Sequence, residues 1–173
     1  MQVEKITEIK KELVSLSAKQ LTDICLRLAK YKKENKELLN YLLYDAHAPL
    51  QYCEKVKSSL EEEFRNLSKH YYQSTKQLRK ILRTLNKHAK YTANKQVETE
   101  LLLWFCRNFL EFANTSSSHK PLQGLLIRQL QKIATLTGKL HEDLQFDYER
   151  ELLQLLDLAS KKIRGFNKKD IVL

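Results

Sequence analysis

Glycine and proline are scarce in this sequence. The 173 residues include three Gly and two Pro, whereas sheets built on tight turns use both residue types often. Leu and Lys are frequent, and 30% of the residues are charged. This composition favours connected helices over a turn-rich sheet. We therefore expect an all-α fold, either an irregular antiparallel helical bundle or a short α-α superhelix of about six to eight helices.

Cysteine is also rare, and Cys25, Cys53 and Cys106 lie far apart in the sequence. An odd number of widely spaced cysteines predicts neither a disulfide framework nor a zinc site. We expect reduced, mostly buried thiols in a cytoplasmic protein.

Long apolar runs are missing as well. The most hydrophobic stretch, Leu101–Phe112, is interrupted by Arg107, Asn108 and Glu111, and a membrane-spanning helix needs roughly 20 predominantly apolar residues. The residues after Met1 are Gln, Val, Glu and Lys, which do not form a secretory signal. We expect a soluble chain with no membrane partner.

The usual catalytic motifs are absent from the sequence. The three glycines, at positions 124, 138 and 165, are too far apart for a phosphate-binding loop, and no serine has glycines two residues to either side. None of the five histidines follows a Glu by three residues, as the ligands of a dimetal helical bundle do. We predict no catalytic residue, no cofactor and no metal; an enzyme with an unrecognised site is the third-ranked alternative.

The chain is expected to form a single all-α domain over residues 1–173. Apolar residues at spacings of three and four predict a first helix over residues 3–14 and a second helix from Ala18, with Ser17 as its N-cap. A third helix is predicted over about residues 37–46. Apolar groups cover more than half of its circumference, so it should pack between neighbouring helices.

Pro49 predicts the start of the next helix, because proline fits the first helical turn and not the helix interior. The apolar phase then continues to Ala89 without Gly or Pro. A helix of that length is far above the average, so we expect a break within residues 66–74. Residues 97–113 carry the most hydrophobic pattern and should form the central core helix.

The second half of the chain contains one clear loop signal, the polar segment 114–120. Leucines keep one helical phase from residue 121 to 164, which predicts a helix that continues through Gly138 and stops at Gly165. Residues 166–173 are expected to be a frayed basic tail.

Nearly all of the net charge of +10 comes from one segment, residues 69–95. This segment contains eight Lys or Arg and no Asp or Glu, leaving 23 basic against 21 acidic residues elsewhere. The pattern predicts a basic amphipathic helix over about residues 69–93. On a helical projection, six cations fall within an arc of about 100°, opposite a leucine stripe. The six are Lys76, Arg79, Lys80, Arg83, Lys87 and Lys90.

Residues 21–43 show a second pattern, that of a helical pair. LTDICLRLAKYKKENKELLNYLL, Leu21–Leu43, reads as two short amphipathic helices joined by a polar turn. It resembles the repeating unit of HEAT- and armadillo-type superhelices. The resemblance implies an α-α superhelix and rests on the helical pattern alone.

The six cations suggest a function, since like charges one turn apart repel by roughly 0.2–0.5 kcal/mol per pair. Our leading hypothesis is a non-enzymatic binding module that contacts nucleic-acid backbone. Tyr71, Tyr72 and Tyr91 could stack on unpaired bases, although Tyr71 shares the apolar phase and is expected in the core. The alternatives are a scaffold for an acidic protein partner, pairing with the chain's own acids at 61–63 or 142–143, and a plain solvated surface.

Overall fold

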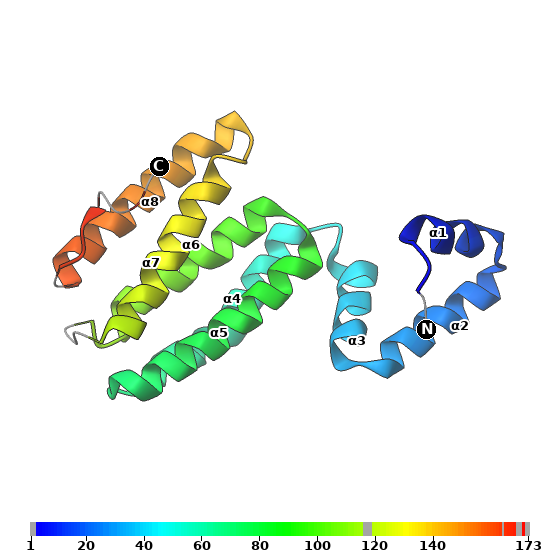
Figure 1. The fold of residues 1–173 in the computed structure, drawn as a ribbon, viewed down its shortest axis with the longest axis horizontal. Helices are drawn as coiled ribbons and strands as arrows, with labels where there is room; N and C mark the ends of the chain where they lie inside the picture. Colours follow the sequence, from blue (N-terminus) through cyan, green and yellow to red (C-terminus); the bar gives the residue numbers. More distant parts are fainter. Residues whose placement is uncertain (1–2, 116–118, 164, 169–170, 172–173) are drawn as a thin grey trace. The chain divides into compact units, whose positions relative to one another are not determined.

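The computed structural model describes residues 3–115, 119–163, 165–168 and 171. Throughout this part of the chain the structure is all-helical, with eight α-helices, one π-helical turn and no strand (Figure 1). The prediction of an all-α fold is confirmed. No helix in the same described ranges is long and apolar enough to cross a membrane.

The chain divides into two compact units, Met1–Ala46 and His47–Leu173. The single domain over residues 1–173 stays a prediction, and each unit is described by itself. The N-terminal unit contains α1 (Ile6–Ser15), α2 (Ala18–Tyr31), α3 (Lys33–Asn40) and a π-helical turn (Tyr41–Asp45).

Ser17 caps α2 as predicted. Its side chain accepts a hydrogen bond from the Gln20 amide at 3.3 Å, and the Gln20 side chain accepts one from the Ser17 amide at 2.9 Å. This reciprocal pair is a capping box, which satisfies two amides that have no partner within the helix. The start of α2 is therefore fixed by hydrogen bonds between two residues three positions apart, the N-cap Ser17 and Gln20.

The helices of the N-terminal unit bury little. Across the described residues of α1, α2 and α3 there is no fully buried side chain. Leu42 and Leu43, in the turn that follows α3, are 55% and 63% exposed. The expected packing of this segment between neighbouring helices is therefore wrong for these two leucines.

The C-terminal unit contains five longer helices. They are α4 (Pro49–Arg65), α5 (Tyr71–Thr92), α6 (Lys95–Phe112), α7 (Lys120–Thr137) and α8 (Glu142–Lys162). Pro49 begins α4, and the predicted break within residues 66–74 separates α4 from α5. Both predictions are confirmed.

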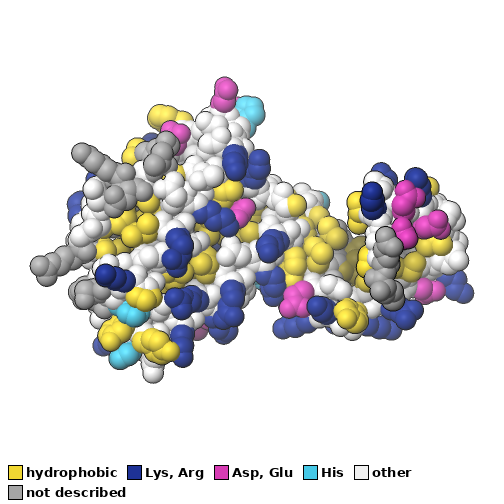
Figure 2. Space-filling model, viewed as in Figure 1, with side chains coloured by type: hydrophobic (Ala, Val, Ile, Leu, Met, Phe, Trp, Pro, Cys, Tyr) yellow, Lys and Arg dark blue, Asp and Glu magenta, His cyan; other side chains and the backbone are white. Residues whose placement is uncertain are grey.

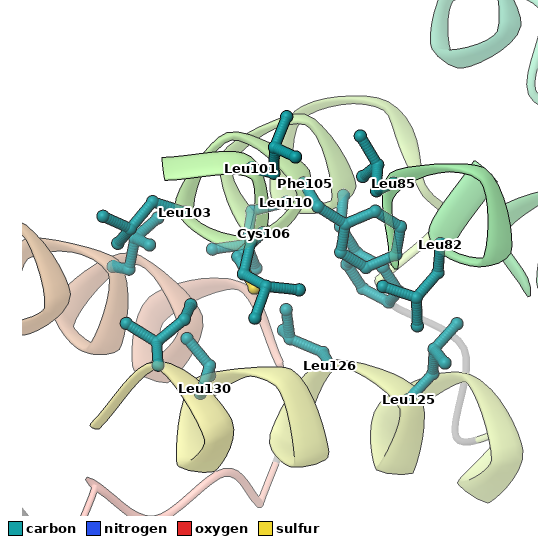
Figure 3. Close-up of a cluster of buried hydrophobic side chains, with 14 of the residues drawn as sticks. Leu82, Leu85, Leu101, Leu103, Phe105, Cys106, Leu110, Leu125, Leu126 and Leu130 are labelled. Carbon is teal, nitrogen blue, oxygen red and sulfur yellow. The ribbon is translucent and has the colours of Figure 1, made fainter. Parts of the chain in front are cut away.

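Helix α6 is the centre of this unit, as its hydrophobicity predicted. It packs against α4, α5, α7 and α8 (Figure 1). Figure 3 shows Leu126 and Leu130 of α7 pointing toward Phe105 and Cys106 of α6, and all four side chains are at most 1% exposed. Burying a leucine or phenylalanine side chain stabilises a fold by roughly 1.5–3 kcal/mol, so α6 and its neighbours supply most of the unit's stability.

The prediction that one helix continues through Gly138 is wrong. Helix α7 ends at Thr137, and α8 begins only at Glu142. In the connection, the amides of Lys139 and Leu140 donate to the carbonyls of Leu136 and Thr137 at 2.9 and 3.0 Å. These bonds close tight turns instead of extending the helix. Both helices then face the same core, which explains why the leucine phase is continuous across the break.

The predicted loop and tail are only partly within the described residues. Positions 116–118 of the loop 114–120 lie outside them, and Lys120 already belongs to α7. In the tail, positions 169, 170, 172 and 173 lie outside as well. The prediction of a frayed tail is wrong for Ile171, which is 5% exposed and belongs to the hydrophobic core. Lys168 also forms an ion pair with Asp157 on α8.

Candidate functional site

The basic amphipathic helix predicted at 69–93 is α5. Its apolar side is buried through Leu78, Ile81, Leu82, Leu85 and Ala89. Of the six predicted cations on the opposite side, Lys87 is half-buried and the other five are exposed. Helical periodicity thus separates a core-facing side from a cationic side on a single element.

A groove of about 630 Å³ runs between α5 and α7. Its charged lining comes from Lys76, Arg79 and Arg83 on α5 and from Arg128 on α7. Leu82, Leu125, Asn86 and Gln129 complete it, and none of these described lining residues is acidic. Figure 2 shows Lys and Arg side chains gathered over α5 and α7, and Figure 3 shows Leu82 and Leu125 close together between the two helices.

The arginines that line the groove are not neutralised by acidic residues of the described chain. No ion pair in the described part of the chain joins Arg79, Arg83 or Arg128 to an acid. The Arg83 Nε donates to the Arg79 carbonyl at 3.4 Å, which orients the guanidinium and leaves its charge intact. Four positive groups therefore share one solvent-accessible groove, and their mutual repulsion favours an anionic ligand.

Lys80 and Lys76, two members of the predicted set of six cations, have partners that belong to α4 and α5. Lys80 forms an ion pair with Glu63 of α4 at 3.4 Å, and both side chains are exposed. Exposed pairs of this kind stabilise by roughly 0–1 kcal/mol, so a stronger anion could displace Glu63. The Lys76 ammonium lies 4.6 Å from the centre of the Tyr72 ring, a cation–π distance. Pairing with the chain's own acids, one of the alternatives above, therefore occurs at Lys80.

Arg128 was missed by the sequence reasoning. Residues 120–137 contain Lys120, Arg128 and Lys132 and no Asp or Glu, so α7 is a second helix without acidic residues. That absence was the available signal, but only the tertiary packing of α7 against α5 makes it informative. Lys132, one turn from Arg128, is instead paired with Glu98 of α6 at 2.6 Å.

An aromatic cluster lies at the N-terminal end of α5. The Tyr71 ring stacks on His70 at 4.8 Å between ring centres and contacts His119 at 4.6 Å. Tyr71 and Tyr72 are 42% and 53% exposed, so the expected core position of Tyr71 is wrong. Tyr91, in contrast, is half-buried and packs against His88 at 5.5 Å. The rings available to a ligand are those at the start of the helix.

The interior of the C-terminal unit contains a separate polar cluster. The Lys57 ammonium donates to Glu100 at 2.9 Å and to Glu54 at 2.7 Å, and the Tyr148 hydroxyl donates to the other Glu100 oxygen at 2.8 Å. Burial would raise the pKa of Glu100, but the bonds from Lys57 and Tyr148 outweigh it and hold the pKa below the ordinary value of 4.5. Burial also raises the pKa of Tyr148. These groups satisfy one another and tie α4, α6 and α8 together.

Cysteines and possible metal ligands occur among the described residues. Cys53 and Cys106 are buried and Cys25 is exposed, and all three are free thiols. Burial raises the pKa of the Cys53 thiol to about 12, which makes it a poor nucleophile at neutral pH. Among the residues that the structure describes, no group of three His, Cys, Asp or Glu side chains could hold a metal ion.

No protein-family model, no curated protein and no solved structure matches this chain. The likeness of Leu21–Leu43 to a HEAT or armadillo unit stays a resemblance of helical pattern. Functional reasoning about this chain therefore starts from the charge and geometry of α5 and α7.

Proposed function

We propose that this chain is a non-enzymatic helical binding module that contacts nucleic-acid backbone through the groove between α5 and α7. The observation that supports this proposal is the lining of that groove: Lys76, Arg79, Arg83 and Arg128 contribute four cations, and no acid lies among the described lining residues. Phosphate diesters are a large and repetitive anionic ligand, so one strand can meet several cations at once.

The type of cation supports a phosphate ligand. Three of the four are arginines, and a guanidinium can donate two parallel hydrogen bonds to one phosphate group. Each phosphate that is neutralised also releases condensed counterions, which makes binding depend steeply on salt. Four contacts to a single strand correspond to a slope of about −3 in log K against log salt, at about 0.7 per contact.

The position of Lys76 connects the groove to the aromatic cluster. Lys76 lines the groove and also lies over the Tyr72 ring. A strand whose phosphates follow the groove would therefore bring its bases close to Tyr72 and Tyr71, which are both exposed. Stacking of a base on an aromatic side chain contributes roughly 1–3 kcal/mol without requiring a particular sequence. This arrangement favours single-stranded over double-stranded ligands.

The proposal is tested by replacing the three arginines, Arg79, Arg83 and Arg128, with Gln in one variant. The matched control replaces three other exposed cations with Gln, namely Lys139 in the connection after α7 and Arg150 and Lys161 on α8, so its net charge changes equally. Binding of a fluorescent 20-nucleotide mixed-sequence oligonucleotide is followed by anisotropy at low salt. We expect at least a tenfold loss in the groove variant and less than a twofold change in the control.

Two results would contradict the proposal. One is the absence of oligonucleotide binding by the parent chain, and the other is an equal loss of affinity in both variants. Polyglutamate of equal charge serves as a competitor for the acidic-protein alternative. Displacement of the oligonucleotide by polyglutamate at equal charge concentration would favour an acidic protein partner, because it would show that phosphate geometry is unimportant.

A further inference from the structure

The floor of the α5–α7 groove carries a largely buried amide side chain, that of Gln129 on α7. The residue is 8% exposed, and it lines the groove together with Asn86 of α5. Its side-chain nitrogen donates to the Leu125 carbonyl at 3.3 Å. Because a carbonyl oxygen can only accept, this bond identifies the nitrogen end of the amide. The other end, Gln129 Oε1, is a hydrogen-bond acceptor.

Gln129 Oε1 has no hydrogen-bond partner within the described ranges of the chain. Among these residues, Thr137 Oγ1 is the side-chain polar atom that is both unbonded and sealed from solvent. Gln129 Oε1 is therefore reached by solvent, and the groove is the opening that this residue lines. A strand that covers the groove floor excludes water from this oxygen, so it either supplies a donor or leaves the acceptor unsatisfied at a cost in affinity.

Asn86 presents the complementary group. Its Oδ1 accepts a long hydrogen bond from the Lys132 ammonium at 3.4 Å. Its side-chain nitrogen, a donor, forms no hydrogen bond inside the part of the chain that the structure describes. Lys132 follows Gln129 by about one helical turn on α7, so its contact with Asn86 places the two amides in the same stretch of the α5–α7 interface. The groove floor thus offers an acceptor and a donor beside its four cations.

These two amides distinguish between the parts of a nucleic acid. Phosphodiester and deoxyribose groups within a strand have acceptor oxygens and no O–H or N–H donor, so neither can donate to Gln129 Oε1. The ribose 2′-hydroxyl is both a donor and an acceptor. It lies on the sugar between successive phosphates, so it enters the groove with the phosphates that Arg83 and Arg128 would hold. Base amino groups are donors as well, but the proposed function places the bases toward Tyr72.

We propose that the α5–α7 groove prefers RNA to DNA, because Gln129 accepts a hydrogen bond from a ribose 2′-hydroxyl and Asn86 donates one to it. This inference rests on the proposed function, since it requires a strand whose phosphates lie in the groove. A neutral hydrogen bond changes a binding constant by roughly two- to tenfold, so RNA should bind the full chain about fivefold more tightly than DNA of the same base sequence. The hydroxyl and the amides are uncharged, so this ratio should stay within about twofold as added salt weakens both complexes.

The first test changes the ligand and keeps the full parent chain. Fluorescence anisotropy compares three strands of one base sequence: RNA, DNA with deoxyuridine in place of thymidine, and 2′-fluoro RNA. Fluorine at the 2′ position keeps the sugar pucker of RNA and removes the O–H donor. The 2′-fluoro strand should therefore bind like DNA, about fivefold more weakly than RNA. This comparison needs no substitution, so it decides the question even if a variant of the buried Gln129 fails to fold.

The second test changes the acceptor. Gln129→Met removes the amide at nearly constant side-chain volume, so it should lower RNA affinity about fivefold and DNA affinity less than about twofold. The Arg79, Arg83 and Arg128 variant serves as the control, because loss of phosphate contacts should weaken RNA and DNA equally. Circular dichroism checks that each variant is folded.

Three results would overturn the inference and leave the proposed function intact. They are equal binding of RNA and DNA by the parent, equal binding of RNA and 2′-fluoro RNA, and an equal loss of RNA and DNA affinity in a folded Gln129→Met variant. The second result would assign any preference for RNA to sugar pucker or to contacts other than the donated hydrogen bond. Binding of no strand by the parent would overturn the proposed function and this inference together.

Discussion

Replacing Glu100 with Gln should destabilise the C-terminal unit through the cluster that ties α4, α6 and α8. The Glu100 carboxylate accepts from Lys57 at 2.9 Å and from Tyr148 at 2.8 Å, and the side chains of Lys57 and Glu100 are 12% and 29% exposed. An amide has one acceptor oxygen where these two donors each need one. One donor therefore faces the amide NH2 group in place of a carboxylate oxygen, and the half-buried Lys57 ammonium loses one of two countercharges.

The size of the effect follows from these contacts. A hydrogen bond to a charged group contributes roughly 1.5–3 kcal/mol, and Lys57 keeps Glu54 at 2.7 Å as a second partner. We therefore expect Glu100→Gln to lower the free energy of unfolding by about 2 kcal/mol, in the middle of that range. Lys57→Met removes the competing donor, so Glu100→Gln should cost less in that background. The resulting coupling energy should be about 1–2 kcal/mol.

Urea unfolding of the parent, both single variants and the double variant measures this coupling at pH 7. The pH dependence gives a second reading, because the folded pKa of Glu100 lies below the ordinary value of 4.5. A depressed folded pKa contributes stability above the unfolded pKa, and this contribution is lost as the pH falls through the folded pKa. The difference between parent and Glu100→Gln should therefore shrink below pH 4.5. Additive single effects, within about 0.5 kcal/mol, would refute the reasoning.

Two further substitutions probe the backbone and the core. Ala93 adopts a left-handed conformation with φ of 47°, so Ala93→Gly should raise the free energy of unfolding by up to about 1 kcal/mol. A decrease in this free energy, measured by urea unfolding, would contradict the inference that Ala93 is strained. Leu126 is fully buried at the contact of α7 with α6, so Leu126→Ala should cost about 2–5 kcal/mol. A loss below about 1 kcal/mol in the same assay would show that this contact is not the packed core described above.

Local sequence signals predicted much of the fold. The position of α5, the break after Asn66, the start of α4 at Pro49 and the Ser17 cap depend on residues within one or two helical turns. Their causes are periodicity, proline geometry and hydrogen bonds to free amides, which can be read from a short window of sequence. The cationic side of α5 can also be read from a short window of sequence, because it follows from helical periodicity.

The remaining features depend on contacts between distant segments. Arg128 becomes part of the groove only because α7 packs against α5. Tyr71 keeps the apolar phase of its helix, yet it lies at an open end next to His119. Helix α7 ends before Gly138 although the leucine phase continues beyond it. The phase is shared because α7 and α8 both pack against α6. Helical phase shows which side of a helix is apolar, and it does not show what covers that side.

The salt dependence of oligonucleotide binding tests the central claim most directly. It counts the ionic contacts made by the groove independently of the absolute affinity. With four groove cations, the parent should give a slope of about −3 in log K against log salt, and the Arg79, Arg83 and Arg128 variant a slope of about −1, at about 0.7 per contact. Equal slopes in the two proteins would show that the α5–α7 groove does not hold the phosphates.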